Sequence, residues 1–581
     1  MVEITVDWEP KRRKLLVRFP FDEAALEHLR NAPDRTFDSV SRAWVMAPAL
    51  ANVQYLNQWG NLRLTPPAAH VFRKINEEEK NAEYNRTLSE RDDLSEKYLD
   101  YTPKTQPFKH QIQAFNLAKM RDSYALFFEQ GLGKTKTSID LASYWMETGE
   151  IDRVLVLCPS FVKTVWPREI ETHATVNNGI AVINASQGDR RRQLVAQYAK
   201  KRGVWLVVNY EEIISSVGPV FQGYVNSGKV LIIADESTKI KNRAAKTTRQ
   251  AVALAKCSTK RLILNGTPIS NSPLDFWSQF RFMLADLGFT DFVSFRNHIA
   301  DMGGFQMHEV LRYKNLEDLQ RRISGFSIRR TKEQCLDLPE KLFQVVEVEL
   351  PKEVKEAYNQ MYEEMVVELT DQADQKGEVA VTNVLAKMQK LAQICGSTLK
   401  MEDGTVTYFK ARPKLDALMD LLLEEISPDK QVVVWSRYIA EIKMISEALT
   451  KAGISHSLNY GETSQADRLK NVDRFQGQGE FKDKPRDRVF VAQPQAAALG
   501  ITLTAASYVI YFSNDFSYYL RAQSEDRTHR IGTVGNVTYM DILAKDTIDE
   551  VVHEVLASKK SMADYILDNK TLPAALLKKI V

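Results

Sequence analysis

The sequence has little of several features that would place it in a specialised class of protein. Only four cysteines occur in 581 residues, and no two form a Cys-x-x-Cys pair, so a disulfide framework and a zinc site are both excluded. The formal net charge is only +3, so any affinity for nucleic acid must come from local basic surfaces. Low-complexity tracts are lacking as well. With 44% hydrophobic and 26% charged residues, the composition is that of a globular protein with several domains.

Long apolar segments are also lacking. The first ten residues, MVEITVDWEP, contain no apolar core of the signal-peptide type. An uncharged stretch lies between Arg488 and Asp515, but Gln493 and Pro494 interrupt it, so we interpret it as two buried strands and a loop. We therefore expect an intracellular, soluble monomer without membrane contact, cytoplasmic rather than nuclear.

What the chain does have is a glycine-rich turn, GLGKT at 131–135. An uncharged run at 124–128 precedes it, and apolar residues at helical spacing follow it. A strand, a glycine turn ending in Lys-Thr and a helix together form a phosphate-binding loop, in which backbone N–H groups and the helix N-terminus hold phosphates. Lys134 would reach the β- and γ-phosphates of ATP, and the Thr135 hydroxyl would hold Mg²⁺. The full pattern asks for a glycine where Phe128 stands, so the turn alone is an incomplete match.

An acidic pair follows another buried run. Val230–Ala234 is uncharged and mostly β-branched, as expected of a strand buried on both faces of a parallel sheet, and Asp235 and Glu236 come directly after it. In open α/β sheets, ligands bind at the carboxyl ends of strands. Asp235 can hold Mg²⁺ there, and Glu236 can orient and deprotonate the attacking water. Together with the glycine-rich turn, the pair predicts ATP hydrolysis.

Apolar runs alternate with helical patterns in two parts of the chain. The first part predicts strands at 124–128, 154–158, 204–208, 230–234 and 261–264, and the second at 432–435, 489–491, 508–512 and 537–542. This alternation is typical of a parallel sheet with helices on both faces. Residues 270–410 are expected to be mostly helical and poor in strands.

Residues 1–65 are predicted to form a small, separate α+β domain. Apolar residues alternate in two runs on either side of the basic cluster Lys11–Lys14, which predicts a hairpin with a basic tip. Phe21–Asn31 is expected to form a helix, and Arg35–Met46 a further pair of strands. The charged segment 66–105 is expected to be a linker helix.

The order of the motifs resembles that of a superfamily 2 motor ATPase of the Swi/Snf type, over roughly residues 105–550. The motifs that carry the resemblance are PFKHQ at 107–111, CPS at 158–160, DESTKIKN at 235–242, NGTPI at 265–269, SIRRTK at 327–332, VVVWSRY at 432–438, GITLTAA at 500–506 and QSEDRTHRIG at 523–532. Relatives of this type also lack the glycine at the place of Phe128. The resemblance implies an α/β fold with two tandem RecA-like lobes, at 106–340 and 411–581, and a helical insertion at 341–410.

The resemblance also implies roles for single residues. It assigns adenine recognition to Gln111 and catalysis to Lys134, Asp235, Glu236, Arg527 and Arg530. The nucleotide-binding set is Gln111, Gly131, Gly133, Lys134, Thr135 and Gly500, and Mg²⁺ belongs to Thr135 and Asp235. Arg527 and Arg530 are three apart, so on a helix they share one face, and as arginine fingers they would offset transition-state charge. Contacts to DNA phosphates, which position the strand without reading its sequence, are implied for Ser160, Lys163, Ser436, Arg437 and Thr502. The motif at 158–160, followed by Trp166 and Glu169, resembles the family's nucleic-acid-contacting motif.

Three positions depart from the family pattern. Thr238 stands where many relatives carry a histidine that contacts the coupling motif, and that motif starts with Asn265 instead of Thr or Ser. Thr533 stands where glutamine is usual. These departures leave the details of coupling open, but not the ATP site.

Residues 1–65 are similar, more weakly, to the small domain of HARP-type annealing helicases. The matching residues are Phe21-Asp22, Arg35, Phe37-Asp38, Arg42 and Trp44-Val45. The resemblance implies a role in recognising branched or forked DNA, and the alternative is a generic β-rich accessory module.

The predicted function is that of a DNA-dependent ATPase that translocates on double-stranded DNA, in branch migration, annealing or remodelling of DNA or protein–DNA structures. ATP and Mg²⁺ are the expected cofactors. The expected partners are double-stranded or branched DNA and other DNA-repair or replication proteins. Three alternatives remain: a strand-separating DNA or RNA helicase of the same superfamily, a nucleic-acid-binding scaffold with a vestigial ATP site, and an ATPase that acts on proteins without DNA.

Overall fold

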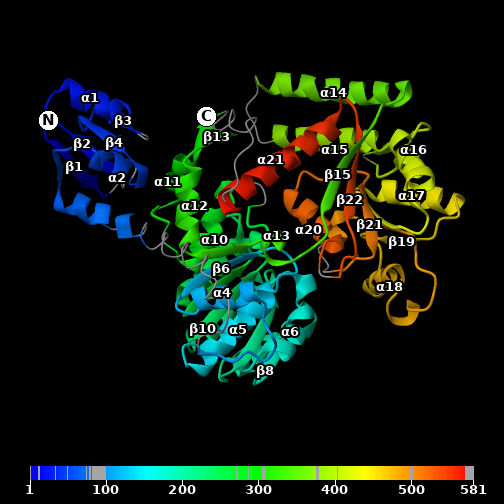
Figure 1. The fold of residues 1–581 in the computed structure, drawn as a ribbon, viewed down its shortest axis with the longest axis horizontal. Helices are drawn as coiled ribbons and strands as arrows, with labels where there is room; N and C mark the ends of the chain where they lie inside the picture. The colour runs from blue at the N-terminus through cyan, green and yellow to red at the C-terminus, as the bar shows by residue number, and fades with distance from the viewer. Residues whose placement is uncertain are drawn as a thin grey trace. The chain divides into compact units, whose positions relative to one another are not determined.

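The structure is a computed structural model, which describes residues 2–10, 14–32, 35–46, 48, 50–73, 75–77, 80, 100–269, 272–285, 287–289, 291–303, 309–373, 379–401, 403–497, 501–530 and 532–568. Two compact units divide the chain: Met1–Thr331 with Ser561–Val581, and Lys332–Lys560. The first unit holds the N-terminal domain and the first lobe, and the second unit holds the second lobe (Figure 1).

A five-stranded sheet forms the N-terminal domain, with the order β3-β4-β2-β1-β5 (Figure 1, dark blue). Its elements are β1 (Ile4–Glu9), β2 (Lys14–Arg18), α1 (Glu23–Arg30), β3 (Thr36–Asp38), β4 (Ala43–Met46), α2 (Leu50–Asn57) and β5 (Leu62–Leu64). The predicted hairpin, helix and second strand pair are therefore confirmed. Residues 11–13 of the basic tip lie outside the described residues. Ala68, Phe72 and Ile75 belong to the same hydrophobic core, which thus continues past the predicted end at residue 65.

The first lobe is built on a seven-stranded sheet with the order β14-β6-β11-β10-β7-β9-β8, in which every pairing is parallel. The strands are β6 (Ser123–Phe128), β7 (Arg153–Cys158), β8 (Gly179–Val182), β9 (Val204–Asn209), β10 (Val230–Asp235), β11 (Lys260–Leu264) and β14 (Ser327–Arg330). Because all strands run the same way, the residues that follow β6, β10 and β11 meet at one edge of the sheet.

Helices connect these strands. They are α4 (Lys109–Ala118), α5 (Lys134–Glu147), α6 (Val165–His173), α7 (Arg190–Tyr198), α8 (Gly218–Asn226) and α9 (Lys246–Cys257). A further group follows β11: α10 (Phe276–Met283), α11 (Phe292–Ile299), the hairpin β12 (Ala300–Gly303) and β13 (Glu309–Tyr313), and α12 (Leu316–Ser324). No helix in the described part of the chain is both long and apolar enough to cross a membrane.

The second lobe has a six-stranded parallel sheet with the order β15-β22-β21-β18-β20-β19. Its strands are β15 (Lys341–Val348), β18 (Gln431–Trp435), β19 (His456–Asn459), β20 (Val489–Ala492), β21 (Ala506–Tyr511) and β22 (Val537–Ala544). The other elements are α13 (Lys332–Cys335), α14 (Lys352–Ala373), α15 (Val379–Cys395), β16 (Thr398–Lys400), β17 (Val406–Tyr408), α16 (Pro413–Asp420), α17 (Ile439–Lys451), α18 (Gln465–Gln476), α19 (Pro494–Ala497), α20 (Tyr518–Thr528) and α21 (Ile548–Asp568).

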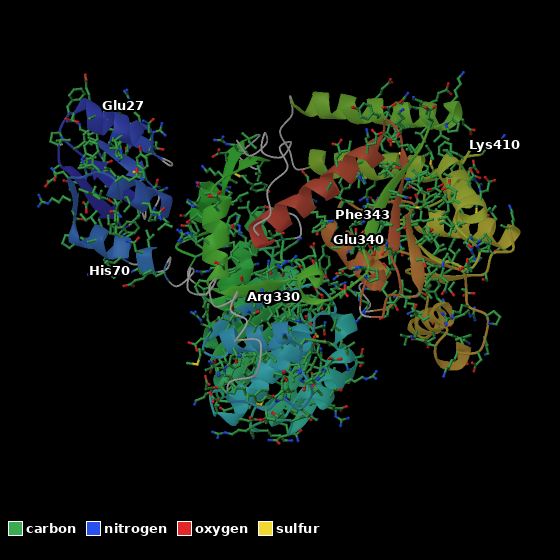
Figure 2. All side chains as sticks on the ribbon, viewed as in Figure 1. Glu27, His70, Arg330, Glu340, Phe343 and Lys410 are labelled. Carbon is green, nitrogen blue, oxygen red and sulfur yellow. The ribbon has the colours of Figure 1, made fainter. Side chains whose placement is uncertain are left out.

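The nine strands expected in the two lobes are all present, so the predicted fold class is confirmed. The expectation that residues 270–410 are poor in strands is wrong, most clearly at β15, which pairs with β22 along its whole length. Figure 2 labels Phe343 on this strand, a residue that is half exposed and stacks on Tyr539 at 5.3 Å between ring centroids. β15 lies at the sheet edge, so its side chains are too polar and exposed to show as a buried run.

Candidate functional site

Two glycines shape the turn between β6 and α5. Gly131 has φ +89° and Gly133 has φ +77°, a left-handed conformation that only glycine adopts readily. At Gly133 there is also no space for a side chain, because a Cβ atom would lie 2.1 Å from the Gln111 amide nitrogen. α5 begins immediately afterwards, at Lys134, so its first backbone N–H groups face the turn. The turn thus has the backbone shape of a phosphate-binding loop.

Lys134 folds back over this turn. Its Nζ donates hydrogen bonds to the backbone carbonyls of Phe128, at 2.7 Å, and Glu129, at 3.4 Å. The side chain is buried, and the next residue, Thr135, is partly exposed. The ammonium group is therefore held beside the turn by carbonyl oxygens, where it can exchange these acceptors for phosphate oxygens.

Gln111 fixes the turn from the side of α4. Its amide nitrogen donates to the Leu132 carbonyl at 3.1 Å, and its amide oxygen accepts from the Phe108 N–H at 3.1 Å. A ring nitrogen of His110 also bonds the Leu132 carbonyl, at 2.8 Å. Gln111 thus lies against the loop that would carry the phosphates, and its predicted role in reading adenine stays a prediction.

The Asp235 carboxylate ends β10 in a buried position, where each of its oxygens accepts one hydrogen bond. The Trp166 indole N–H donates to its Oδ2 at 3.0 Å, and the Glu236 N–H donates to its Oδ1 at 3.0 Å. The Tyr210 hydroxyl donates to the Asp235 backbone carbonyl at 2.7 Å. Burial and the neighbouring Glu236 raise the pKa of the Asp235 carboxyl to about 7. A positive ion that binds beside a buried carboxyl lowers its raised pKa, so that the group ionises again. This is the behaviour expected of a Mg²⁺ ligand.

Glu236 has φ +50°, a conformation that is uncommon for a residue with a long side chain. Its side chain is only partly buried, directly after the strand end. Conformations of this kind cost about 1–3 kcal/mol and persist where the surroundings enforce them, often at functional sites.

A hydrogen-bonded chain joins the acidic pair to the motif that follows β11. The Asn265 amide donates to the Ser237 hydroxyl at 3.0 Å, and that hydroxyl donates to the Gln279 side-chain oxygen at 2.6 Å. The Thr267 N–H donates to the Asn265 side-chain oxygen at 3.0 Å, and Gln279 in turn bonds the Pro268 carbonyl at 2.9 Å. Ser237, and not Thr238, therefore makes the link that a histidine makes in the family pattern. Gln279, which lies on α10, was not predicted from the sequence.

The residues present fit ATP and Mg²⁺. The turn offers backbone N–H groups and one lysine, and Thr135 and Asp235 offer the hydroxyl and carboxylate oxygens that Mg²⁺ prefers. Arg329 of β14 contacts two residues at this edge of the sheet. It donates to the Gly266 carbonyl at 2.7 Å and lies 3.5 Å from a Glu129 carboxylate oxygen. Arg330, labelled in Figure 2, donates to the Gln113 side chain on α4.

In the second lobe, α20 carries one of the two predicted arginine fingers and ends before the other. The helix stops at Thr528, so Arg527 lies in its last turn and Arg530 lies beyond it. The prediction that both arginines share one helix face is therefore wrong. Thr533 accounts for the ending, because its hydroxyl accepts from the Arg530 N–H at 3.1 Å and bonds the Thr528 carbonyl at 2.8 Å. The Arg530 guanidinium donates to the Thr502 hydroxyl at 3.0 Å, and burial lowers its pKa.

Two sequence families match the chain. The SNF2-related domain matches residues 110–399, and the helicase conserved C-terminal domain matches residues 413–532, so together they cover well over half of the chain. The chain belongs to the SNF2 family of helicase-like proteins. The Swi/Snf-type resemblance predicted from the motifs is confirmed, while the similarity of residues 1–65 to HARP-type domains stays a prediction.

Curated relatives of this SNF2-family chain are distant. An uncharacterised ATP-dependent helicase of Mycoplasma genitalium is 26% identical over 75% of this chain and 39% of its own length. A Caenorhabditis elegans homologue of SWI/SNF-related matrix-associated actin-dependent regulator of chromatin subfamily A-like protein 1 is 25% identical over 93% of this chain and 73% of its own. Human DNA annealing helicase and endonuclease ZRANB3 is 24% identical over 82% and 42%.

The chain spans about two fifths of the length of the first curated relatives it matches. Among solved structures, the Sulfolobus solfataricus SWI2/SNF2 ATPase core in complex with double-stranded DNA is 23% identical, with a TM-score of 0.37. That similarity covers 84% of this chain and 99% of the other.

The residues predicted to contact DNA in this SNF2-family chain differ in how exposed they are. Ser160 is exposed at the start of a short turn of helix, Ser160–Val162. Lys163 is buried, and its Nζ donates to the Ile183 carbonyl at 3.0 Å and the Asn209 side chain at 2.7 Å. In this structure, then, the Lys163 charge is engaged inside the first lobe, and a phosphate contact would have to replace one of these bonds.

Ser436, in the second lobe, is also buried and hydrogen-bonded within its own lobe. It is fully buried, and its hydroxyl donates to Glu441 at 2.6 Å, so it presents no hydroxyl at the surface. Arg437 pairs with Asp515 at 3.2 Å, and Thr502 accepts from Arg530. Gly500, predicted to touch the nucleotide, lies outside the described residues. The DNA contacts of all five residues remain predictions.

Arg521 anchors α20 to the sheet of the second lobe. Its guanidinium binds both Asp541 oxygens, at 2.6 and 2.9 Å, and Glu525 at 2.9 Å, and Lys341 of β15 lies 3.1 Å from the second Glu525 oxygen. Burial opposes ionisation of Glu525, but Lys341 and Arg521 together lower its pKa to about 2.

Arg521→Met should lower the free energy of unfolding of the second unit by about 3–5 kcal/mol, because it takes the guanidinium away from the buried Asp541 carboxylate and from Glu525, which keeps Lys341. Glu525 has a depressed pKa, so its contribution to stability is present above about pH 4.5 and is lost as the pH falls towards 2. Urea unfolding at pH 7 and at pH 3 measures both effects. We expect the difference between the proteins to shrink at pH 3, and an equal difference at both pH values would contradict this assignment.

Proposed function

We propose that the chain is a DNA-stimulated ATPase that translocates on double-stranded DNA, with Mg²⁺ and ATP bound at the first lobe. The observation that carries the proposal is the assembly at one sheet edge of the glycine turn, Lys134 and the Asp235–Glu236 pair, with the adjacent Ser237 hydrogen-bonded to Asn265. The second lobe supplies a second parallel sheet, in which the segment with Arg527 and Arg530 connects β21 to β22.

Each residue in the first lobe has a defined task. The backbone of the turn and Lys134 bind phosphate oxygens, while Thr135 and Asp235 would hold Mg²⁺. The metal ion, when bound, neutralises charge on the phosphates. Glu236 accepts a proton from the attacking water, and Ser237 passes any change at this point on to Asn265 through one hydrogen bond.

We assign the N-terminal domain to the recognition of branched or forked DNA, as its similarity to HARP-type domains implies. The alignment with the Caenorhabditis elegans relative covers 93% of this chain, so it leaves out fewer residues than the domain contains. Part of the domain is therefore aligned with that relative.

The test is the ATPase rate with single-stranded, duplex, forked and four-way DNA. We expect duplex DNA to stimulate turnover, and forks to stimulate it further. The comparison protein lacks residues 1–99 and begins at Asp100. It keeps Tyr101, which stacks on Phe115 at 5.2 Å and so belongs to the first lobe. This truncation should remove the preference for forks and leave the stimulation by duplex.

Two outcomes would contradict the proposal. A rate that no DNA changes would favour an ATPase that acts on proteins. A fork preference that survives the truncation would leave the N-terminal domain as a generic accessory module. Strand displacement measured on the same DNA and on RNA duplexes decides between translocation and strand separation.

A further inference from the structure

Trp166 lies in a segment that the motif pattern assigns to nucleic acid, yet the structure places it inside the ATP site. It is in the first turn of α6 and has no exposed surface. Its indole N–H donates to Asp235 Oδ2 at 3.0 Å. These two residues are 69 positions apart in the sequence, and the contact exists because β7 and β10 are neighbours in the sheet.

This hydrogen bond restricts the rotation of the Asp235 carboxylate about its side-chain bond. Each carboxylate oxygen accepts two hydrogen bonds or one bond and a metal contact. Oδ1 already accepts the Glu236 N–H, and Oδ2 accepts the indole, so each oxygen keeps one free position. An indole is a rigid donor with no acceptor function, and this one is packed on all sides, so it fixes the carboxylate plane.

The same segment approaches Asp235 from a second side. Lys163, three residues before Trp166, donates to the Asn209 side chain at 2.7 Å. Asn209 is followed by Tyr210, whose hydroxyl donates to the Asp235 backbone carbonyl at 2.7 Å. A displacement of residues 160–166 would therefore reach Asp235 through its side chain and through its backbone.

We propose that Trp166 is a positioning residue, which orients the Asp235 carboxylate for Mg²⁺ and connects that carboxylate to the 160–166 segment. The first part concerns the ATP site alone. The second part, in which DNA at this segment alters the metal site, rests on the proposed function. Partners that hold a metal ligand in place typically change metal affinity by about 10–100-fold when they are removed.

The decisive variant is Trp166→Phe, which keeps an aromatic ring and removes the N–H. The first lobe offers two matched controls, Trp145→Phe and Trp205→Phe. Both tryptophans are buried, and their indole groups donate to the backbone carbonyls of Lys119, at 2.9 Å, and Val176, at 3.0 Å. All three variants lose one indole hydrogen bond and the same atoms, so they share any general cost in stability.

We expect Trp166→Phe to require about 10–100-fold more Mg²⁺ for half-maximal binding of a fluorescent ATP analogue, and for half-maximal turnover. Binding of the analogue in EDTA, and the melting temperature relative to the two controls, should not change. A Mg²⁺ dependence equal to that of the controls would overturn the positioning role.

Intact protein labelled with ¹⁵N-tryptophan gives a second measurement that needs no altered site. The Trp166 indole signal is identified by its absence in Trp166→Phe, and it should shift when Mg²⁺ and ADP are added together but not with ADP in EDTA. Duplex DNA without nucleotide should shift it as well. A signal that ignores Mg²⁺ overturns the positioning role, and one that responds to Mg²⁺ but ignores DNA overturns the connection to the 160–166 segment. If DNA does not stimulate ATPase activity at all, the proposed function fails instead, and the Mg²⁺ results still stand.

Discussion

Arg530→Ala should lower the maximal ATPase rate by about 10³–10⁵-fold, the range typical of an arginine that offsets charge in the transition state of phosphoryl transfer. Nucleotide binding should remain, because the phosphate loop and the Asp235–Glu236 pair belong to the first lobe. Burial lowers the pKa of Arg530, and one guanidinium nitrogen is held by the Thr502 hydroxyl at 3.0 Å. A partly buried guanidinium with few partners is suited to gain energy when it meets a phosphate.

Arg527 requires a more conservative substitution than alanine, because it is almost fully buried at the end of α20. Arg527→Lys keeps the charge and removes the planar guanidinium, so a finger role predicts a large loss of rate with little change in stability. Arg474→Ala is the control, since this arginine also lies in the last turn of a second-lobe helix, where its guanidinium stacks on Phe481. Single-turnover rates with saturating ATP and duplex DNA measure the effect. A loss of less than about tenfold in Arg530→Ala would exclude a finger role, given the range above.

The parts of the fold that could be predicted are those that one short stretch of sequence specifies. Val230–Ala234 and Val432–Trp435 are buried on both faces of a parallel sheet, so they read as uncharged runs, and both are strands. The glycine turn could be predicted for the same local reason. Gly131 and Gly133 adopt the left-handed conformations that their residue type suggested.

Strands that lie at sheet edges or carry charge could not be predicted in this way. β14 consists of Ser-Ile-Arg-Arg, and both arginines are taken up by contacts to the Gly266 carbonyl and the Gln113 side chain. β15 is exposed on most positions and is recognisable as a strand only through its pairing with β22. In both strands, the hydrogen-bonding partner comes from a distant part of the chain, which local periodicity does not contain.

The site shows the same limit. The acidic pair and Lys134 were predicted, but the groups that orient them were not, because they arrive from other strands and helices. Trp166 was assigned to a nucleic-acid motif, and the structure shows its indole on Asp235. The departure at Thr238 left the details of coupling open, and the structure shows the Ser237 hydroxyl between Asn265 and Gln279. Arg530 was placed on a helix that ends two residues earlier.

Glu236→Gln should lower the maximal ATPase rate by about 10²–10⁴-fold, the usual contribution of a general base, and should leave ATP binding in the presence of Mg²⁺ intact or tighter. Glutamine has nearly the same shape, and the strained backbone at φ +50° is common to both residues, so the fold should not distinguish them. The substitution removes only the ability to accept a proton and one negative charge beside Asp235, whose pKa that charge raises.

Lys134→Ala provides the contrast within the same site. It removes the ammonium group that the Phe128 carbonyl holds over the turn, so it should weaken nucleotide binding as well as turnover. Equilibrium binding of a fluorescent ATP analogue, measured beside single-turnover hydrolysis, separates the two variants: Glu236→Gln should bind without hydrolysing, and Lys134→Ala should do neither. Unchanged turnover in Lys134→Ala, with DNA binding retained, would identify a scaffold with a vestigial ATP site. If Glu236→Gln turned over at the unmodified rate, the base would have to be sought elsewhere at the same sheet edge.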